Sequence, residues 1–553
     1  MTDAIRTASR RKPMMMRPLA AGTIVLIAAT QTACNRSTVP LYPDLGSLHH
    51  AITTRSPEAQ KYFDQGLRLT YAFNHAEAIR AYREAARIDP DCSMCYWGIA
   101  LAYGPNINLP MDSAGGAAAY EAIQQAVRLR GATGGAEGAY VTALARRYGP
   151  GPTADRAARD SAYAAAMGDL ARRYPEDADA ATLYGDAMMN LRPWNYWTRD
   201  GRPQPGTADI VAALEHAIAR DSTNPGACHL YIHAVESSPD PSRAVPCAER
   251  LASLMPGAGH LVHMPAHIYM VLGRYADAIT ANEHAVHTDE VYLGGQRPQS
   301  FYPMMYYPHN IHFLSVASSF DGKSAEAIRS ARQLVTKVPL EALRDAPPLE
   351  MFLPIPLLAL VRFGRWEEIL AEPAPDSSLL YWRGIRHYAR GVAFAATNRP
   401  AEAAGEYDSL AALAGSMPPD AMVGINASRT VLTLAQHALA GELASRRGRT
   451  AEAVRHFEEA VRIEDGLTYD EPPAWPNPVR QSLGAVLLEA RRAADAERVY
   501  REDLRRHPEN GWSLFGLKAS LSAQGKTAAA DSVDQRFRRA WARADVTLTA
   551  SRF

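Results

Sequence analysis

The feature that most constrains the fold of this chain is a pattern of paired helices that recurs about every 34 residues from residue 59 onward. In its first copy, PEAQKYFDQGLRLTYAFNHAEAIRAYREAARIDP, small residues and a tyrosine return at helical spacing, and proline closes the unit. A single helix pair cannot bury its own apolar face, so such units are stable only when neighbours stack on one another. The pattern therefore predicts an all-α chain built as a stack of helix pairs.

This unit resembles the tetratricopeptide repeat (TPR). The residues of the first copy that have the spacing of that family are Gly66, Ala78, Tyr82, Ala85 and Pro90. Matching residues return in windows that begin at 225, 259, 308, 434 and 477. The resemblance implies a right-handed superhelical solenoid over residues 58–545, with His-rich central repeats at 225–341 and C-terminal repeats at 350–544. It also implies a concave groove that binds a peptide or protein partner.

Four segments rich in proline and aromatic residues interrupt the period. They are residues 104–115, 191–207, 288–307 and 466–476. Long insertions in a compact repeat array are often lids or binding loops. We therefore expect these segments to form loops that cover a groove.

The N-terminus has the features of an export signal. Several arginines precede a short apolar segment at 18–30, which is too short to span a bilayer as a helix. Thr32-Ala33-Cys34 resembles a bacterial lipobox, although Gln31 stands where that motif has an aliphatic residue. We expect a signal peptide at 1–34, a solvated tether at 35–57 that includes His49 and His50, and a periplasmic or outer-membrane lipoprotein anchored through Cys34. Secretion after ordinary cleavage is the alternative.

The cysteines that follow Cys34 are Cys92, Cys95, Cys228 and Cys247. An exported protein is free to form disulfides. Cys92 and Cys95 are expected to form a local disulfide or to remain two inert thiols, and the sequence leaves the pairing of Cys228 and Cys247 open. Charge excludes one class of partner: Lys and Arg total 59, as do Asp and Glu, so no basic excess points to nucleic acid.

Histidines are concentrated in the central repeats. Nine of the chain's 17 histidines fall between residues 228 and 312, where an even spread would put two or three. Most are three or four residues apart, so each group shares one helical face. In the TPR family, positions 2, 5, 9 and 12 of the first helix line the groove. The residues at these positions with ligand side chains are His229, His233, Glu236, His260, His263, His267, His309 and His312. His284 and His287 are expected to lie away from the groove.

These eight residues predict a metal site. Packed helices are about 8–10 Å apart, so side chains from neighbouring first helices can reach one ion. Imidazole is the commonest protein ligand for zinc and copper, and a histidine-dominated set disfavours calcium and magnesium. We predict one or two transition-metal ions, with copper favoured and zinc or iron as alternatives.

The reaction stays open at this stage. Copper or iron would suit an oxidase, which we favour, and zinc would suit a hydrolase with Glu236 or Asp186 as its base. HExxH, GxSxG and Walker motifs are absent from the sequence. The alternatives are a non-catalytic metal buffer and a TPR scaffold that binds a peptide or protein partner.

Overall fold

The computed structural model describes residues 39–130, 135–151, 155–296 and 300–553. The expected signal peptide and its Cys34 lie outside the described residues. The chain divides into two compact units, Met1–Pro40 and Leu41–Phe553, and all described helices belong to the second. None of these helices combines the length and the apolar character that a membrane span needs.

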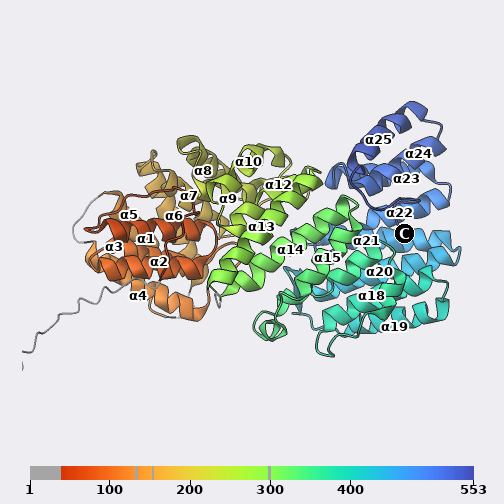
Figure 1. Cartoon of the computed structure of the whole chain (residues 1–553), viewed down its shortest axis with the longest axis horizontal. Coiled ribbons are helices and arrows are strands. Elements are labelled where there is room, and N and C mark those ends of the chain that lie inside the picture. The colour runs from red at the N-terminus through yellow and green to blue at the C-terminus, as the bar shows by residue number, and fades with distance from the viewer. Residues whose placement is uncertain (1–38, 131–134, 152–154, 297–299) are drawn as a thin grey trace, which may run out of the picture. The chain divides into compact units, whose positions relative to one another are not determined.

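Helices follow one another in pairs along the chain (Figure 1). The N-terminal and central helices are α1 (Pro57–Tyr71), α2 (His75–Ile88), α3 (Ser93–Ala102), α4 (Ser113–Leu129), α5 (Ala136–Ala145), α6 (Arg156–Arg173), α7 (Ala178–Met189), α8 (Thr207–Arg220), α9 (Pro225–Val235), α10 (Val245–Leu254), α11 (Gly259–His263), α12 (Pro265–Val271), α13 (Tyr275–Gln296), α14 (Phe301–Phe320) and α15 (Ser324–Val335). The predicted TPR-like solenoid of helix pairs is confirmed.

The C-terminal helices continue the same arrangement. They are α16 (Ile355–Arg362), α17 (Trp366–Ala371), α18 (Leu380–Ala396), α19 (Pro400–Ser416), α20 (Ser428–Arg446), α21 (Thr450–Gly466), α22 (Val479–Glu489), α23 (Ala493–Arg506), α24 (Gly511–Ala523) and α25 (Thr527–Ala540). The short 3-10 helices are η1 (Pro241–Ala244), η2 (Leu340–Arg344) and η3 (Pro347–Phe352). Strands β1 (Met422–Val423) and β2 (Asn426–Ala427) form a small antiparallel hairpin.

Close helix crossings explain the small residues of the repeat. A Cβ added at Gly66 would lie 2.6 Å from the ring of Tyr82, which is fully buried. The same contact recurs near the other end of the chain, where a Cβ at Gly484 or Gly516 would lie 2.4 or 2.1 Å from the ring of Tyr500. Because protein interiors are close-packed, these glycines let a large aromatic ring fill the space between successive helices.

The segment 288–307 differs from the sequence expectation. It is mostly helical rather than a loop, because α13 runs to Gln296 and α14 begins at Phe301. Tyr302, Tyr306 and Tyr307 are buried, so the helix is stabilised by packing. The other three interruptions contain irregular chain, with isolated bridges inside 104–115 and 191–207.

Residues 41–56 lie within the range predicted to be a solvated tether, but they bond to the helices. Arg68 Nε donates to the Leu48 carbonyl (2.8 Å). His49 Nδ1 is 2.8 Å from Asp64, and His50 Nδ1 is 2.8 Å from Asp179 on α7. Carboxylates of α1 and α7 thus hold this segment against the repeats.

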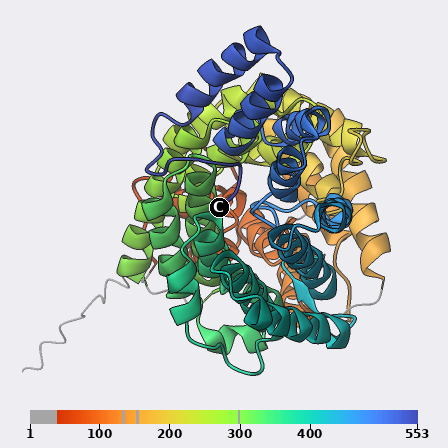
Figure 2. The same ribbon diagram turned by 90° about the vertical axis from the view of Figure 1, so that its right-hand side faces the viewer.

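The last helix pairs contact the middle of the chain. Trp512 Nε1 on α24 donates to the Ser319 carbonyl at the end of α14 (3.1 Å). Arg543 forms a 2.6 Å ion pair with Asp321. Figure 2 shows these C-terminal helices, in blue, beside the green and yellow central helices. Segments more than 190 residues apart in sequence are therefore neighbours.

Two disulfides are present in the described chain. Cys92 pairs with Cys95 at the start of α3, which is the local bond that the sequence allowed. Cys228 pairs with Cys247, a pairing that the sequence left open. The second bond ties α9, which carries two of the candidate ligands, to α10.

Candidate metal centre

Six of the eight predicted ligands come together in two groups of three histidines, and Glu236 forms a third group with His233 and His267. The first trio is His229, His233 and His260, and the second trio is His263, His267 and His309. Within each trio, one ligand nitrogen from every ring lies within 4.8 Å of the others. All six residues are at most 8% exposed, so the cluster is buried.

The start of α9 sets the positions of two rings in the first trio. The Asn224 side chain accepts a 2.9 Å hydrogen bond from the third N–H of the helix, and Pro225 occupies the first position. Both residue types are favoured where helices begin. From this start His229 and His233 are one turn apart, and their ring centroids are 5.0 Å apart.

A break between α11 and α12 keeps the next three histidines aligned. Pro265 has no N–H to donate, so the helix is interrupted there. Met264 nevertheless keeps helical dihedrals (φ −49°, ψ −35°). One helical face therefore carries His260, His263 and His267. His260 belongs to the first trio, and the other two residues belong to the second trio.

Nε2 atoms face one another inside both trios. His229 Nε2 is 3.1 Å from His260 Nε2. In the second trio, His263 Nε2 is 2.9 Å from His267 Nε2 and 3.1 Å from His309 Nε2. The buried His233 Nε2 has no hydrogen-bond partner among the described residues. The Nε2 atoms are thus the candidate ligand atoms.

In several of these histidines the other ring nitrogen, Nδ1, already has a hydrogen-bond partner. His229 Nδ1 is 2.7 Å from the Tyr71 carbonyl, which can only accept. His263 Nδ1 is 2.6 Å from Asn282 Oδ1. Asn282 Nδ2 donates to the Ala278 carbonyl (2.7 Å), which fixes the amide with its oxygen toward the ring. Both histidines therefore carry their proton on Nδ1.

Glu236 connects the two trios. Its Oε1 accepts from His233 Nδ1 (2.8 Å) and its Oε2 accepts from His267 Nδ1 (2.6 Å). Burial opposes the ionised carboxylate, but the two histidines hold the pKa of Glu236 at about 2. The carboxylate thus orients one ring of each trio with its Nε2 turned inward, as carboxylates do behind metal-bound histidines.

These contacts have a direct electrostatic consequence. His263 and His267 both donate from Nδ1, and their Nε2 atoms lie only 2.9 Å apart, so each Nε2 presents a lone pair unless that ring carries a second proton. Two lone pairs repel at this distance unless a cation lies between them, and the cation is a proton or a metal ion. Burial and the neighbouring His267 ring hold the pKa of His263 well below its usual range. Either a proton held on the ring that is bonded to Glu236 or a metal ion fits this contact.

Aromatic rings enclose the cluster. The Phe73 ring lies 4.4 Å from the His229 ring, and Tyr306 lies 4.5 Å from His260. The Phe313 ring lies 4.6 Å from the rings of both His263 and His267. Apolar walls exclude water, which strengthens electrostatic interactions inside the site.

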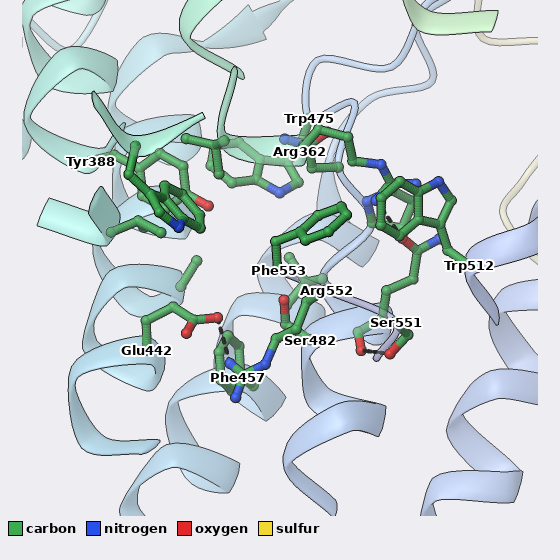
Figure 3. A pocket seen from close by; sticks show the side chains of 18 residues that line it. Arg362, Tyr388, Glu442, Phe457, Trp475, Ser482, Trp512, Ser551, Arg552 and Phe553 are labelled. Atoms are coloured by element: carbon green, nitrogen blue, oxygen red, sulfur yellow. Dashed lines mark hydrogen bonds and ion pairs between the residues drawn. The ribbon is translucent and has the colours of Figure 1, made fainter. Parts of the chain in front are cut away.

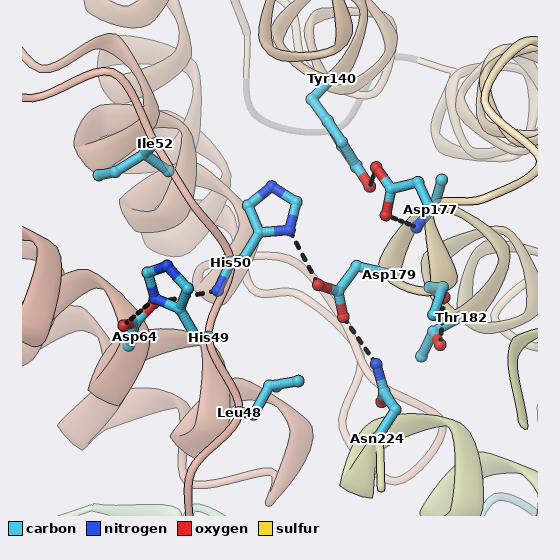
Figure 4. A network of polar contacts seen from close by, with 12 residues as sticks. Leu48, His49, His50, Ile52, Asp64, Tyr140, Asp177, Asp179, Thr182 and Asn224 are labelled. Atoms are coloured by element: carbon cyan, nitrogen blue, oxygen red, sulfur yellow. Dashed lines mark hydrogen bonds and ion pairs between the residues drawn. The ribbon is translucent and has the colours of Figure 1, made fainter. Parts of the chain in front are cut away.

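A buried network behind α9 was missed by the sequence analysis (Figure 4). Asp179 Oδ1 accepts from Tyr71 OH and from Asn224 Nδ2, each at 2.8 Å, and its Oδ2 bonds to His50. Burial alone would raise the pKa of Asp179, but its bond to His50 keeps it low. Asp179 thereby holds Tyr71, whose carbonyl accepts from His229, and Asn224, which caps α9. No local spacing in the sequence links these positions.

The network includes a further group of candidate metal ligands. His50, Asp177 and Asp179 each offer one atom within 4.8 Å of the others. Asp177 accepts from Tyr140 OH (2.8 Å), and its second oxygen caps α7. The carboxylates already have donors, so the group is complete as a hydrogen-bonded network.

The loop 467–478 reaches the cluster from the C-terminal repeats. Tyr469 OH donates to Glu236 Oε2 at 3.4 Å. Burial raises the pKa of Asp470 to about 7. Burial and the charge of Glu236 raise the pKa of Glu471 well above its usual range. This loop includes most of the predicted insertion 466–476, and it brings two half-buried carboxyl groups toward the trios.

Two predicted residues lie apart from both trios. His312 is buried and stands 5.7 Å from the Phe352 ring, and both of its ring nitrogens lack a partner in the described chain. Asp186, predicted as an acid or base, hydrogen-bonds with Asn190 (3.0 Å), and burial raises its pKa to about 6. Neither residue is in a group of candidate ligands. His284 and His287 are exposed on α13, away from the cluster.

Fold and site together define a class: an all-α, TPR-like solenoid with a buried histidine cluster. Comparison with solved structures gives a human IFIT1 dimer with m7Gppp-AAAA (13% identity, 88% of this chain and 91% of that chain, TM-score 0.33). It also gives yeast Tom70 (12%, 88% and 91%, TM-score 0.27) and the P58(IPK) TPR domain (11%, 85% and 99%, TM-score 0.23). No family model and no curated protein matches the sequence.

Proposed function

We propose that this protein is a metalloprotein that holds two copper ions, one in each histidine trio. The observation that carries this proposal is the pair of Nε2 atoms of His263 and His267, 2.9 Å apart with both Nδ1 atoms already bonded to acceptors. In the first trio, His229 Nε2 is 3.1 Å from His260 Nε2, and His260 Nδ1 has no partner among the described residues. Three imidazoles per ion match the number of protein ligands at many open metal sites.

The donor set favours copper. Each trio offers imidazole nitrogens without cysteine, and divalent copper binds such sites more tightly than zinc or iron does. Glu236 was predicted as a ligand, but both of its oxygens accept from histidine Nδ1 atoms. We therefore assign it an orienting role behind both ions. The alternatives are a single ion in one trio with the other trio as support, and zinc or iron in place of copper.

Burial favours redox chemistry over hydrolysis. The six ligands are at most 8% exposed and aromatic rings enclose them. A hydrolase must bring a scissile bond of its substrate to the ion, whereas an oxidase can admit dioxygen to buried ions and take its electrons from an organic reductant that binds outside the cluster. We therefore propose a copper-dependent oxidase. The protein positions the rings and excludes water, and copper supplies the electron transfer.

Metal analysis tests this function. The protein would be produced without a histidine tag, loaded with copper, desalted and measured by elemental mass spectrometry. We expect about two copper ions per chain. His284→Ala serves as the control because His284 lies on α13 outside the cluster. Copper well below one ion per chain after loading would contradict the proposal.

A metal buffer is the second function that the same trios support. A buffer and an oxidase both bind copper, so dioxygen consumption with reductants of several classes separates them. Rapid transfer of copper to a chelator without dioxygen consumption would favour the buffer. The burial of both trios predicts slow transfer instead.

A peptide or protein partner in the groove is the third candidate, because the fold is TPR-like. Parts of the inner surface already hold the chain's own residues, including Tyr469 beside Glu236 and Phe553 beside Trp512. Partner capture by cross-linking, with and without chelation, tests this role. Binding that survives metal removal would separate it from the copper function.

We also propose that the protein is exported and anchored through Cys34. Two disulfides, Cys92–Cys95 and Cys228–Cys247, support an oxidising compartment. A Cys34→Ser variant is expected to leave the membrane fraction of fractionated cells. An unchanged membrane fraction would contradict the anchor.

A further inference from the structure

The segment that follows α25 lies along the inner surface of the C-terminal repeats. Residues 545–553 form neither helix nor strand, yet Leu548 and Ser551 are buried. Most of the side chains that the end of the segment contacts come from α20, α22 and α24, the first helices of their pairs. The candidate metal ligands also lie on first helices. An extended stretch of this chain therefore covers part of the inner surface.

Ser551 fixes the position of this stretch. Its Oγ donates to the Gln481 carbonyl on α22 (2.8 Å) and accepts from Tyr500 OH on α23 (2.6 Å). Because one hydroxyl makes both contacts, the segment has a defined register on the helices. The two residues that follow, Arg552 and Phe553, are thereby placed on the inner surface.

Arg552 binds acidic and polar groups of the surface. Its Nη1 donates to Glu442 Oε1 (2.5 Å), and its Nη2 donates to Ser445 Oγ (3.0 Å) and Glu489 Oε1 (3.1 Å). The side chains of Arg552 and Glu442 are 11% and 10% exposed, so this ion pair is largely withdrawn from water. Among the described residues, Arg552 is the only cation paired with Glu442. A buried carboxylate without a cation is strongly unfavourable, so any segment that replaces this one must supply a positive charge.

Phe553 lies among aromatic rings beside a cavity of about 60 Å³ (Figure 3). Its ring centre is 5.7 Å from that of Trp512, and the two rings are nearly perpendicular. Tyr388 and Trp475 also line the cavity. Aromatic walls favour another aromatic ring at this position. The cavity leaves room for a ring larger than that of phenylalanine.

Side chains, rather than the backbone, attach the segment. Asp545 N donates to the Gly322 carbonyl (3.1 Å), but residues 546–553 form no backbone-to-backbone hydrogen bond within the described chain. An extended peptide that joins a sheet is held mainly by its main chain, whereas this segment is held by what Ser551, Arg552 and Phe553 contact. Another segment with the same side chains can therefore take its place.

We propose that this inner surface is a binding site for extended peptide segments of a partner protein in which arginine precedes an aromatic residue. Residues 545–553 are its resident occupant. Glu442 binds the arginine, and Trp512 packs against the aromatic ring. The inference specifies the partner of the peptide-binding role named above, and it does not depend on the copper sites. A partner must compete with a covalently attached segment, which has a high effective concentration.

Fluorescence anisotropy with a labelled synthetic peptide of residues 545–553 tests the site. Metal-free protein in chelator is used, so the result is independent of copper binding. The double variant Arg552→Ala/Phe553→Ala should release the resident segment and bind the peptide at least about tenfold more tightly than the unsubstituted protein, because more of the protein has a free site. Equal affinity of the folded variant and the unsubstituted protein would overturn the proposal. If the double variant does not fold, Arg552→Ala alone serves, because Phe553 is retained.

Two further changes locate the peptide. In the released protein, Glu442→Gln should weaken peptide binding at least about tenfold, because the arginine loses its buried partner. Glu452→Gln is the control, since Glu452 pairs with Arg449 on the partly exposed side of α21. A peptide with Arg552→Ala should bind as weakly to the released protein as the original peptide binds to the Glu442→Gln variant. Equal binding of peptides with and without the arginine would contradict the proposed recognition.

Discussion

The inner surfaces of the central and C-terminal repeats bury polar groups in opposite ways. The central surface holds two trios of buried imidazoles whose Nε2 atoms face one another, and Glu236 is bonded to two of the rings. The C-terminal surface holds Arg362, whose N–H edge has no acceptor among the described residues. The first surface gathers imidazole rings around one carboxylate, whereas on the second surface Gln481 lies between Arg362 and the buried carboxylate of Asp503.

The comparison shows how one fold supports different chemistry. In both regions, packing between helices depends on small residues and buried aromatics, as at Gly66 with Tyr82 and Gly484 with Tyr500. Inward-facing residues are free of that packing role, so they can vary. The repeat fixes where a side chain points, and the residue type at that position sets the ligand.

The largest expected effect follows from His263→Ala. This change removes the ring whose Nε2 contacts two others in the second trio. We expect loss of about one of the two copper ions, together with the stability that the ion contributes. Elemental analysis and thermal unfolding of the copper-loaded variant measure both effects, with His284→Ala as the control. Two retained ions would show that the second trio is not a site.

A smaller effect is expected from Glu236→Gln. The amide keeps the shape of the side chain but removes the charge and can accept from only one of the two histidines. Loss of such an orienting group typically lowers metal affinity about 10–100-fold. Competition with a chelator of known affinity measures the change. Affinity that falls at one ion only would show that Glu236 does not connect the trios.

The two surfaces are expected to respond independently. Arg362→Gln should leave the copper content unchanged, because Arg362 contacts Gln481 in the C-terminal repeats rather than a candidate ligand. Elemental analysis of the copper-loaded variant tests this statement. A loss of copper would show that the two surfaces are coupled through the loop 467–478.

The smallest effect concerns His312, which the sequence predicts as a ligand and the structure separates from the trios. His312→Phe should keep both copper ions and stabilise the protein by about 1–2 kcal/mol, because two buried nitrogens without partners are removed. Chemical unfolding of metal-free protein measures this gain. Loss of copper in this variant would restore His312 to the ligand set.

The gain from His312→Phe should grow in acid. Burial lowers the pKa of His312 to about 3, so the unfolded chain takes up a proton that the folded chain excludes. The native protein therefore loses stability as pH falls below about 6.5, until the folded ring also protonates near 3. Unfolding at pH 5 and pH 8 tests this, and an equal gain at both values would contradict the shift.

Much of the fold follows from the sequence because the repeat is local. Gly66, Tyr82, Gly484 and Tyr500 lie at spacings that one helix pair defines, and their contacts are those expected. The segment 288–307 was expected to be a loop because of its prolines and aromatics. Burial of its tyrosines between neighbouring helices outweighed those local signals and kept it helical.

The candidate site was only partly predictable, because many of its contacts join segments that are far apart in sequence. Helical periodicity brings His263 and His267 together, but it cannot show that Asn282 from α13 holds one ring. His50 and Tyr469 reach the region from segments far away in sequence, through the fold of the whole unit. His312 shares a groove position with the ligands, and only the three-dimensional arrangement separates it from them.

Anomalous diffraction at the copper absorption edge from copper-loaded crystals would locate the ions themselves. We expect two peaks, one among the Nε2 atoms of His229, His233 and His260 and one among those of His263, His267 and His309. Glu236 should stay on the Nδ1 side of both sites. Copper bound only elsewhere, such as at His50 and Asp179, or no peak within the cluster, would contradict the account.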